Sequence, residues 1–324
     1  MKYPLLFVLL AVFIQACTKE QQKSPVPQPE RQQSQPAPAQ AVPTFDGTKA
    51  FEYLKAQTNL GPRNPGSAGH QKCLDYLQSE LRQYADAVNL QPFTLPGYDG
   101  ETLKLTNLIA SFNLQSTTRI LLIAHWDTRP RADQEKDPRK RNQPILGAND
   151  GASGVAIYLE IARHLRSTPP AIGIDILFVD GEDYGKEGDT QNYLLGARYF
   201  AEHLPEGFSP AFGILLDMVG DKQLEIRKEQ YSMKYAPDVV ELVWSTAAEL
   251  GVEQFSSFTQ DAVTDDHLPL NDAGIKTIDL IDFNYPDATN RFWHTTEDTP
   301  DKCSPESLEA VGKVILNVIY AYKP

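Results

Sequence analysis

Runs of apolar residues that end on a histidine or a carboxylate are the feature that most limits the folds open to this chain. Five such runs end on potential metal ligands, which are His125, Asp150, Glu182 with Asp183, Asp217, and His294. In an open α/β sheet the ligand crevice lies at the carboxyl ends of the strands, so residues distant in sequence can meet there. Two histidines and several carboxylates suit a catalytic zinc site.

The order of extended and helical patterns predicts the fold class. Strands are expected at 103–111, 119–124, 172–179, 211–218 and 277–283. Helices are expected at 67–84, 151–167, 194–204, 238–250 and 305–322, the last with Ser304 as its cap and Pro305 in its first turn. This alternation predicts one α/β domain with a central mixed, mostly parallel, twisted sheet flanked by helices on both faces.

Composition narrows the class of partner. The 324 residues, 41% of them hydrophobic, are enough for one large globular domain. A formal charge of -13 argues against a nucleic-acid partner, because binding a phosphate backbone needs a basic face.

The first 43 residues are predicted to direct export and anchoring. Residues 1–16 have a short charged start and an apolar core too short to span a bilayer, as in a signal peptide. The segment ending in Cys17 resembles a bacterial lipobox, so Cys17 is the expected lipidation site; an ordinary signal peptide is the alternative. Residues 17–43, rich in Pro and Gln, are expected to be a flexible linker. We therefore expect an exported lipoprotein on the periplasmic or outer-membrane face, held to the membrane through its lipid only, with a catalytic domain at 44–324.

The remaining cysteines and histidines leave some questions open. Cys73 and Cys303 could form a disulfide in an exported protein, or could be free buried thiols. Three of the six histidines, His125, His267 and His294, lie in Trp- or Asp-rich contexts. The other three, His70, His164 and His203, are expected on loops or helix surfaces, and the polar segment 129–143 is expected to be a mobile loop at the rim of the site.

Six motifs occur in the order found in the zinc aminopeptidase superfamily, and they most resemble its metal-dependent, animal-type glutaminyl cyclase branch. The motifs are Ala124-His125-Trp126-Asp127-Thr128, Gly147-Ala148-Asn149-Asp150, Asp180-Gly181-Glu182-Asp183, Leu216-Asp217-Met218-Val219-Gly220, Asp265-Asp266-His267-Leu268-Pro269 and Trp293-His294-Thr295-Thr296-Glu297-Asp298. The resemblance covers roughly residues 51–322.

This resemblance implies a role for each matching residue. In the cyclase branch Asp150, Asp183 and His294 would hold one zinc ion with an open position, Glu182 would be the general acid/base, and Asp217 and Asp266 would be carboxylates hydrogen-bonded around it. In two-metal aminopeptidases Asp150 would bridge both ions, and His125 and Asp217 would bind the second. Asp127 beside His125 is a further candidate for the second metal or for supporting a ligand.

Two matches favour the cyclase branch and two departures stand against it. Trp293 resembles the cyclase wall that packs on the substrate, and Asp266 supplies a carboxylate where these aminopeptidases commonly have Ser-Asp-His. Against this, Asp183 is one methylene shorter than the usual glutamate ligand. The expected second aromatic wall is also missing from its usual place, which leaves Trp126, Tyr184 or Tyr193.

The sequence thus predicts a zinc-dependent glutaminyl-peptide cyclotransferase, which converts the N-terminal glutamine of peptides or proteins to pyroglutamate and releases ammonia. The alternative is an aminopeptidase that uses the same residues with two zinc ions. A binding domain without activity is a third possibility, but it predicts lost ligands, and every ligand position is filled.

Overall fold

The computed structural model describes residues 11–12, 41–186 and 188–323. The predicted signal peptide, Cys17 and nearly all of the predicted linker therefore lie outside the described residues. Within the described part, no helix has the length and apolar character needed to cross a membrane. The body that begins near residue 40 forms one compact unit.

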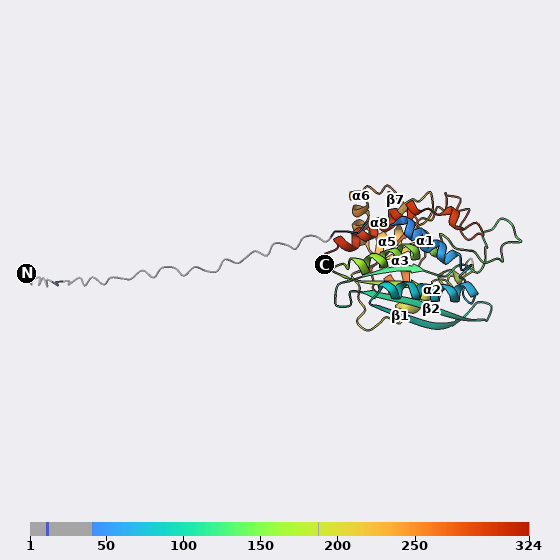
Figure 1. Cartoon of the computed structure of the whole chain (residues 1–324), viewed down its shortest axis with the longest axis horizontal. Coiled ribbons are helices and arrows are strands. Elements are labelled where there is room, and N and C mark those ends of the chain that lie inside the picture. The colour runs from blue at the N-terminus through green and yellow to red at the C-terminus, as the bar shows by residue number, and fades with distance from the viewer. Residues whose placement is uncertain (1–10, 13–40, 187, 324) are drawn as a thin grey trace, which may run out of the picture. The chain divides into compact units, whose positions relative to one another are not determined.

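A six-stranded mixed sheet forms the centre of this body (Figure 1). Its strands are, in spatial order, β1 (Ala87–Pro96), β2 (Thr102–Phe112), β4 (Gly173–Val179), β3 (Arg119–His125), β5 (Phe212–Asp217) and β8 (Thr277–Ile281). The pairs β4–β3, β3–β5 and β5–β8 are parallel, and β1–β2 and β2–β4 are antiparallel. A mixed, mostly parallel sheet was predicted and is confirmed. A separate parallel pair consists of β6 (Ile226–Glu229) and β7 (Phe255–Gln260).

Helices cover both faces of the sheet, as the alternation of strands and helices predicts. The α-helices are α1 (Gly47–Thr58), α2 (Ala68–Tyr84), α3 (Ala152–Ser167), α4 (Leu195–Glu202), α5 (Gln230–Tyr235), α6 (Pro237–Glu249), α7 (His267–Asp272) and α8 (Pro305–Ala321). Two short 3-10 helices are η1 (Glu182–Tyr184) and η2 (Pro300–Lys302).

Strand β3 shows why both faces are covered. Ile120 and Leu122 pack into the larger apolar cluster, with side chains of α3 and α8. Leu121 and Ile123 point the other way, into a cluster with Phe200 of α4 and Leu270 of α7. Successive side chains of a strand alternate between faces, so an unbroken apolar run is what a strand buried on both sides requires. Each such side chain stabilises the fold by about 1.5–3 kcal/mol.

The structure corrects four expectations about local structure. The apolar runs before Asp150 and His294 are turns and loops rather than strands. His70 and His164 are buried, since His70 lies 2.9 Å from Asp180 Oδ1 and His164 lies 2.9 Å from Glu160 Oε1. A buried imidazole needs such a partner for its ring nitrogens. The partner of His70 is distant in sequence, whereas that of His164 lies one helical turn before it. His203 is exposed as expected.

Cys73 and Cys303 are both buried and free. Of the two possibilities that the sequence leaves open, the structure shows unpaired thiols.

Candidate active site

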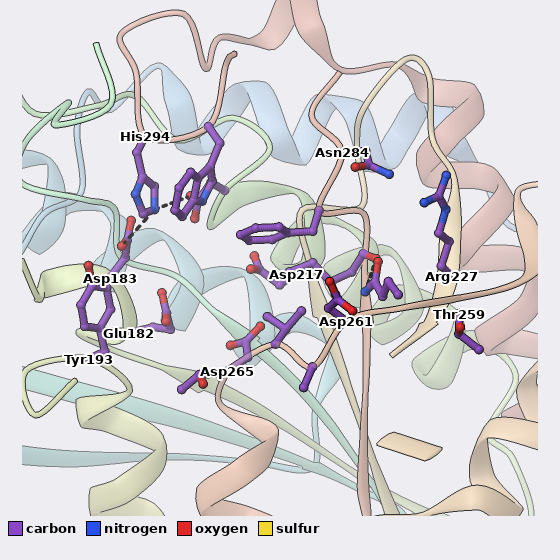
Figure 2. A pocket seen from close by; sticks show the side chains of 18 residues that line it. Glu182, Asp183, Tyr193, Asp217, Arg227, Thr259, Asp261, Asp265, Asn284 and His294 are labelled. Atoms are coloured by element: carbon purple, nitrogen blue, oxygen red, sulfur yellow. Dashed lines mark hydrogen bonds and ion pairs between the residues drawn. The ribbon is translucent and has the colours of Figure 1, made fainter. Parts of the chain in front are cut away.

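The carboxyl edge of the sheet gathers the predicted residues around one pocket (Figure 2). His125 and Asp217 are the last residues of β3 and β5, and Glu182 and Asp183 lie in η1, just after β4. Gly181 precedes them with a φ of 74°, a left-handed conformation that glycine adopts without strain, which turns the chain sharply at the strand end. The cavity has a volume of about 570 Å³.

One group of potential ligands consists of Asp150, Asp183 and His294, whose donor atoms all lie within 4.8 Å of one another. His294 Nε2 is 3.3 Å from Asp183 Oδ1 and 3.5 Å from Asp150 Oδ2. Asp183 Oδ2 is buried without a hydrogen-bond partner in the part of the chain that the structure describes. A buried carboxylate oxygen is costly to leave unpaired, and two carboxylates with one imidazole are zinc ligands. The residues present therefore fit a zinc ion.

Two buried residues hold Asp150 and Asp183 from behind. Asp298 accepts hydrogen bonds from the backbone N–H groups of Asn149 and Asp150, at 2.9 and 3.2 Å. Asp127 accepts one from the backbone N–H of Glu182 at 3.1 Å and lies 3.5 Å from His125 Nδ1. Among the residues described, Asp127 belongs to neither ligand group, so its place is that of a supporting residue.

A second group, His125, Asp150 and Asp217, shares Asp150 with the first. His125 Nε2 is hydrogen-bonded to Asp217 Oδ1 at 3.1 Å and lies 3.3 Å from Asp150 Oδ1. Burial lowers the pKa of His125, but the negative charge of Asp217 and the hydrogen bonds that three aspartates accept from the ring outweigh burial and raise that pKa well above its usual range. In the chain without a metal, His125 is therefore a cation paired with these carboxylates.

Four carboxyl groups that are not in the first group line the same pocket: Glu182, Asp217 and Asp265, with Asp261 as the fourth. Burial, followed by the charge of Asp183, raises the pKa of Glu182 well above its usual range. Burial and the charge of Asp217 do the same to Asp265. Since closely spaced carboxylates resist simultaneous ionisation, this cluster retains a proton near neutral pH.

The structure places Asp265, and not the predicted Asp266, in the lining of the pocket. Asp265 lines the pocket, whereas Asp266 is fully buried outside the lining, and burial raises its pKa to about 8. Asp266 is the residue immediately before α7, which begins at His267, and the sequence alone does not tell which of the two aspartates lines the pocket.

Arg129 is a functional-site residue that the sequence analysis missed. Its guanidinium is 1% exposed, and its Nη1 lies 2.6 Å from Asp183 Oδ1. Burial raises the pKa of Asp183, but the charges of His294 and Arg129 outweigh burial and hold that pKa well below its usual range. Asp183 is therefore ionised, as a metal ligand must be. The expected mobile loop at 129–143 is thus wrong for its first residues, which are anchored in the site.

Aromatic side chains line part of the pocket. Trp293 lies in the lining and stacks on His294, with ring centroids 3.7 Å apart. Of the three possible second walls, only Tyr193 lines the pocket. Trp126 is buried against His70, and Tyr184 stacks on Tyr98 away from the pocket. Phe283, which the sequence did not single out, also lines it, edge to face with Trp293 at 5.2 Å.

Comparisons with solved structures identify similar proteins. A glutaminyl cyclase from Bacteroides thetaiotaomicron, solved with bound N-acetylhistamine, is 42% identical; the match covers 87% of this chain and all of that one, with a TM-score of 0.84. A glutaminyl cyclase from Tannerella forsythia is 41% identical, over 87% of this chain and all of that one, with a TM-score of 0.83. Other solved structures of about the same identity are described as a zinc-dependent exopeptidase and a leucine aminopeptidase precursor.

Curated relatives include both activities as well. Aminopeptidase YwaD of Bacillus subtilis is 29% identical over 85% of this chain, which spans 57% of that protein's length. The model of peptidase family M28 matches residues 107–319, which include every potential ligand described above. The ordered motifs, the sheet with its ligands at the carboxyl edge and this match together show that the chain belongs to peptidase family M28.

Proposed function

We propose that the protein is a zinc-dependent glutaminyl-peptide cyclotransferase, which closes the N-terminal glutamine of a peptide or protein into pyroglutamate. The observation that carries the proposal is the cluster of Glu182, Asp217 and Asp265 in the pocket that also contains Asp150, Asp183 and His294. A ring closure that moves a proton from an amine to a leaving ammonia needs such a proton-sharing group. The similarity to two bacterial glutaminyl cyclases supports it.

The proposed reaction is intramolecular. The α-amino nitrogen of the substrate attacks its own γ-carboxamide carbon, a C–N bond forms, and ammonia leaves, so water is not consumed. Because both reacting groups belong to one residue, the pocket lowers the barrier mainly by holding them in ring geometry. A zinc ion held by Asp150, Asp183 and His294 would supply Lewis-acid polarisation of the γ-carbonyl oxygen.

Glu182 is the proposed acid/base. Its carboxylate takes a proton from the attacking amine and returns it to the departing nitrogen, which the raised pKa of a buried glutamate suits. Asp217 and Asp265, in the same pocket, share the proton between these two steps. We assign to Asp265 the place that the sequence suggested for Asp266, because only Asp265 lines the pocket.

The pocket has two ends with different chemistry (Figure 2). Glu182, Asp183, Tyr193 and His294 lie at one end, and Trp293 and Phe283 add apolar walls for the methylenes of a glutamine side chain. The other end is polar, with Arg227, Thr259 and Asn284. A cavity of about 570 Å³ is in the range that holds a complete small ligand, so this end has room for the residues that follow the glutamine.

The alternative function is an aminopeptidase with two metal ions. The second ligand group, His125, Asp150 and Asp217, is the observation that favours it, because its donor atoms also converge within 4.8 Å. In that case Asp217 would be a ligand and could not share a proton with Glu182.

The test is to give the purified full chain, loaded with zinc, a glutaminyl peptide and a leucyl anilide, and to measure ammonia and free aniline. The proposal expects ammonia from the glutaminyl peptide and a mass loss of 17 Da in the product, consistent with ring closure. Aniline release without ammonia would replace cyclisation by the aminopeptidase function. Omitting zinc from a chelated sample is the control.

Export and lipid anchoring through Cys17 are also part of the proposal, supported by the sequence pattern of residues 1–17. We expect the protein in the membrane fraction of the producing cell and Cys17→Ser in the soluble fraction. The same distribution for both proteins would remove the lipid anchor from the account.

A further inference from the structure

Residues 129–135 connect the two sides of the first ligand group. We propose that Arg129 and Asp133 are a positioning pair that holds Asp183 and His294 in the geometry needed to bind zinc. This inference rests on the metal group of the proposed function, but it does not depend on which of the two reactions the site performs.

Arg129 fixes one oxygen of Asp183 and leaves the other free. Its Nη1 donates to Asp183 Oδ1 at 2.6 Å, whereas Asp183 Oδ2 is buried with no hydrogen-bond partner among the described residues. The same Nη1 also donates to the backbone carbonyl of Asp183 at 3.4 Å, so the guanidinium, whose donors have fixed directions, holds both the side chain and the backbone of this ligand. The arrangement leaves Oδ2 as the atom for the metal.

Asp133 holds the guanidinium from its other side. Arg129 Nε donates to Asp133 Oδ1 at 2.8 Å and Nη2 donates to Asp133 Oδ2 at 2.6 Å, which is a bidentate pair. The ring of Tyr193, a pocket residue, lies 5.4 Å from the guanidinium carbon. Arg129 therefore has contacts on several sides and cannot swing away from Asp183 without breaking them.

The same short segment reaches His294. Asp133 Oδ1 lies 3.8 Å from His294 Nδ1, the ring nitrogen that faces away from Asp150 and Asp183. The backbone N–H of Gln134 donates to the carbonyl of His294 at 3.3 Å. His294 has a φ of 53°, which is uncommon for a residue with a side chain, so its conformation depends on contacts of this kind.

Asp183 makes this support important. An aspartate has one methylene fewer than a glutamate, so its carboxylate has less reach with which to correct an error in backbone position. Residues behind a metal ligand commonly contribute 10–100-fold to metal affinity by orienting that ligand. Arg129 could also act in the opposite direction, because its positive charge repels a cation. If Arg129 positions the ligand, its removal weakens zinc binding. If its charge mainly repels the cation, its removal strengthens zinc binding.

The experiment measures the zinc dissociation constant of the purified full chain by competition with a chromogenic chelator. Arg129→Met keeps much of the apolar stem and removes every donor, and we expect it to bind zinc at least about tenfold more weakly. Arg129→Lys keeps the positive charge and a hydrogen-bond donor but loses the planar group. Its zinc dissociation constant should lie between those of Arg129→Met and wild type. Asp133→Asn should weaken zinc binding in the same direction.

The matched control is Arg119→Met. Arg119 forms a bidentate pair of the same kind with Asp175, at 2.7 and 2.8 Å, at the opposite end of β3. Loss of that pair can lower stability, but it should leave the zinc dissociation constant unchanged. Circular dichroism checks that each variant is folded.

The possible results separate the claims. Unchanged or tighter zinc binding by folded Arg129→Met would overturn the positioning role, and tighter binding would show that Arg129 only screens charge. If Arg129→Met does not fold, Arg129→Lys and Asp133→Asn decide, and wild-type affinity in both would overturn the role. Failure of the wild-type chain to bind zinc would instead refute the metal group on which the proposed function depends.

Discussion

The two ligand groups share Asp150, but they differ in how many hydrogen bonds and ion pairs their side chains form with one another in the absence of a metal. In the second group His125 is hydrogen-bonded to Asp217 at 3.1 Å and carries a positive charge of its own. In the first group His294 Nε2 is only within ion-pair distance of Asp183, and Asp183 Oδ2 is buried without a hydrogen-bond partner in the described residues. The first group therefore gains more from a cation than the second.

This difference bears on the choice between cyclase and peptidase. A cation at the second group would have to displace the proton of His125 and break its hydrogen bond with Asp217. A cation at the first group would find Asp183 Oδ2 without a hydrogen-bond partner and would replace only the 3.3 Å contact between His294 Nε2 and Asp183. The comparison favours one metal ion at Asp150, Asp183 and His294, with Asp217 left free to share a proton with Glu182.

The largest expected difference is between the zinc contents of two variants, His294→Ala in the first ligand group and His125→Ala in the second. We expect His294→Ala to lose bound zinc and all measurable ammonia release, because the first group keeps only two carboxylates. His125→Ala should keep its zinc, though its activity should fall because Asp217 loses its cationic partner. Metal content by mass spectrometry, with ammonia release in parallel, checks both. Loss of zinc from His125→Ala would place the ion in the second group instead.

Glu182→Gln separates proton transfer from metal binding. The amide keeps the shape of the side chain but cannot accept a proton, so kcat should fall about 100–10,000-fold while zinc content stays at the wild-type level. Wild-type kcat in this variant would remove Glu182 from the mechanism. Glu202→Gln, at the exposed end of α4, is the matched control and should behave as wild type.

Glu229 supports the segment that carries Asp265, and its contribution to the stability of the fold should depend on pH. Its buried carboxylate accepts hydrogen bonds from Tyr231 N, Ser232 N and Val263 N, and Val263 belongs to the segment that carries Asp265. Burial raises the pKa of Glu229, but these bonds and that from His267 outweigh burial and lower the pKa to about 2.

An unfolded glutamate has a pKa of about 4.3, so the folded form binds its proton less readily. The stabilisation is complete above about pH 4.3 and is lost as the pH falls toward 2. Glu229→Gln should therefore unfold with a free energy about 2 kcal/mol lower near pH 7, and the difference from wild type should shrink at pH 3. Urea unfolding of the chelated proteins measures this. An equal difference at both pH values would show that the charge of Glu229 is not what stabilises the segment.

Trp293 should give the smallest effect, on substrate binding. It lines the pocket and also stacks on His294, so it could act as a wall or as a support for the first group. As a wall, Trp293→Ala should raise KM about tenfold with zinc affinity unchanged, and Trp293→Phe should recover part of the loss. A fall in zinc affinity with constant KM would assign it to support of His294.

Much of the fold follows from local pattern. The strands β3, β4 and β5 are apolar runs buried on both faces, and α8 begins at the predicted cap, where Ser304 accepts a hydrogen bond from Ser307 N. Strand β1 was not predicted, because it lies at the edge of the sheet and most of its side chains are at least partly exposed. Helix α1 has only a weak apolar pattern and was also missed.

The site divides in the same way. His125 and Asp217 lie at strand ends, whereas Asp150 and His294 follow apolar runs that form turns, and motif resemblance gave those two residues their expected role. Arg129 acts through a contact with Asp183, which is distant in sequence, and no local pattern points to it. Asp298 belongs to a recognised motif, but its hydrogen bonds to the backbone of Asn149 and Asp150 do not follow from that motif. Asp265 and Asp266 are adjacent residues in a segment without regular periodicity, so the sequence pattern does not predict which of the two side chains lines the pocket.

The most direct test is a zinc titration of the chelated full chain, with ammonia release from a glutaminyl peptide followed at each addition. The account predicts that activity rises linearly and reaches its maximum at one zinc ion per chain, with Asp150, Asp183 and His294 as the ligands. A maximum reached only at two ions per chain, or activity that appears without any bound metal, would contradict it.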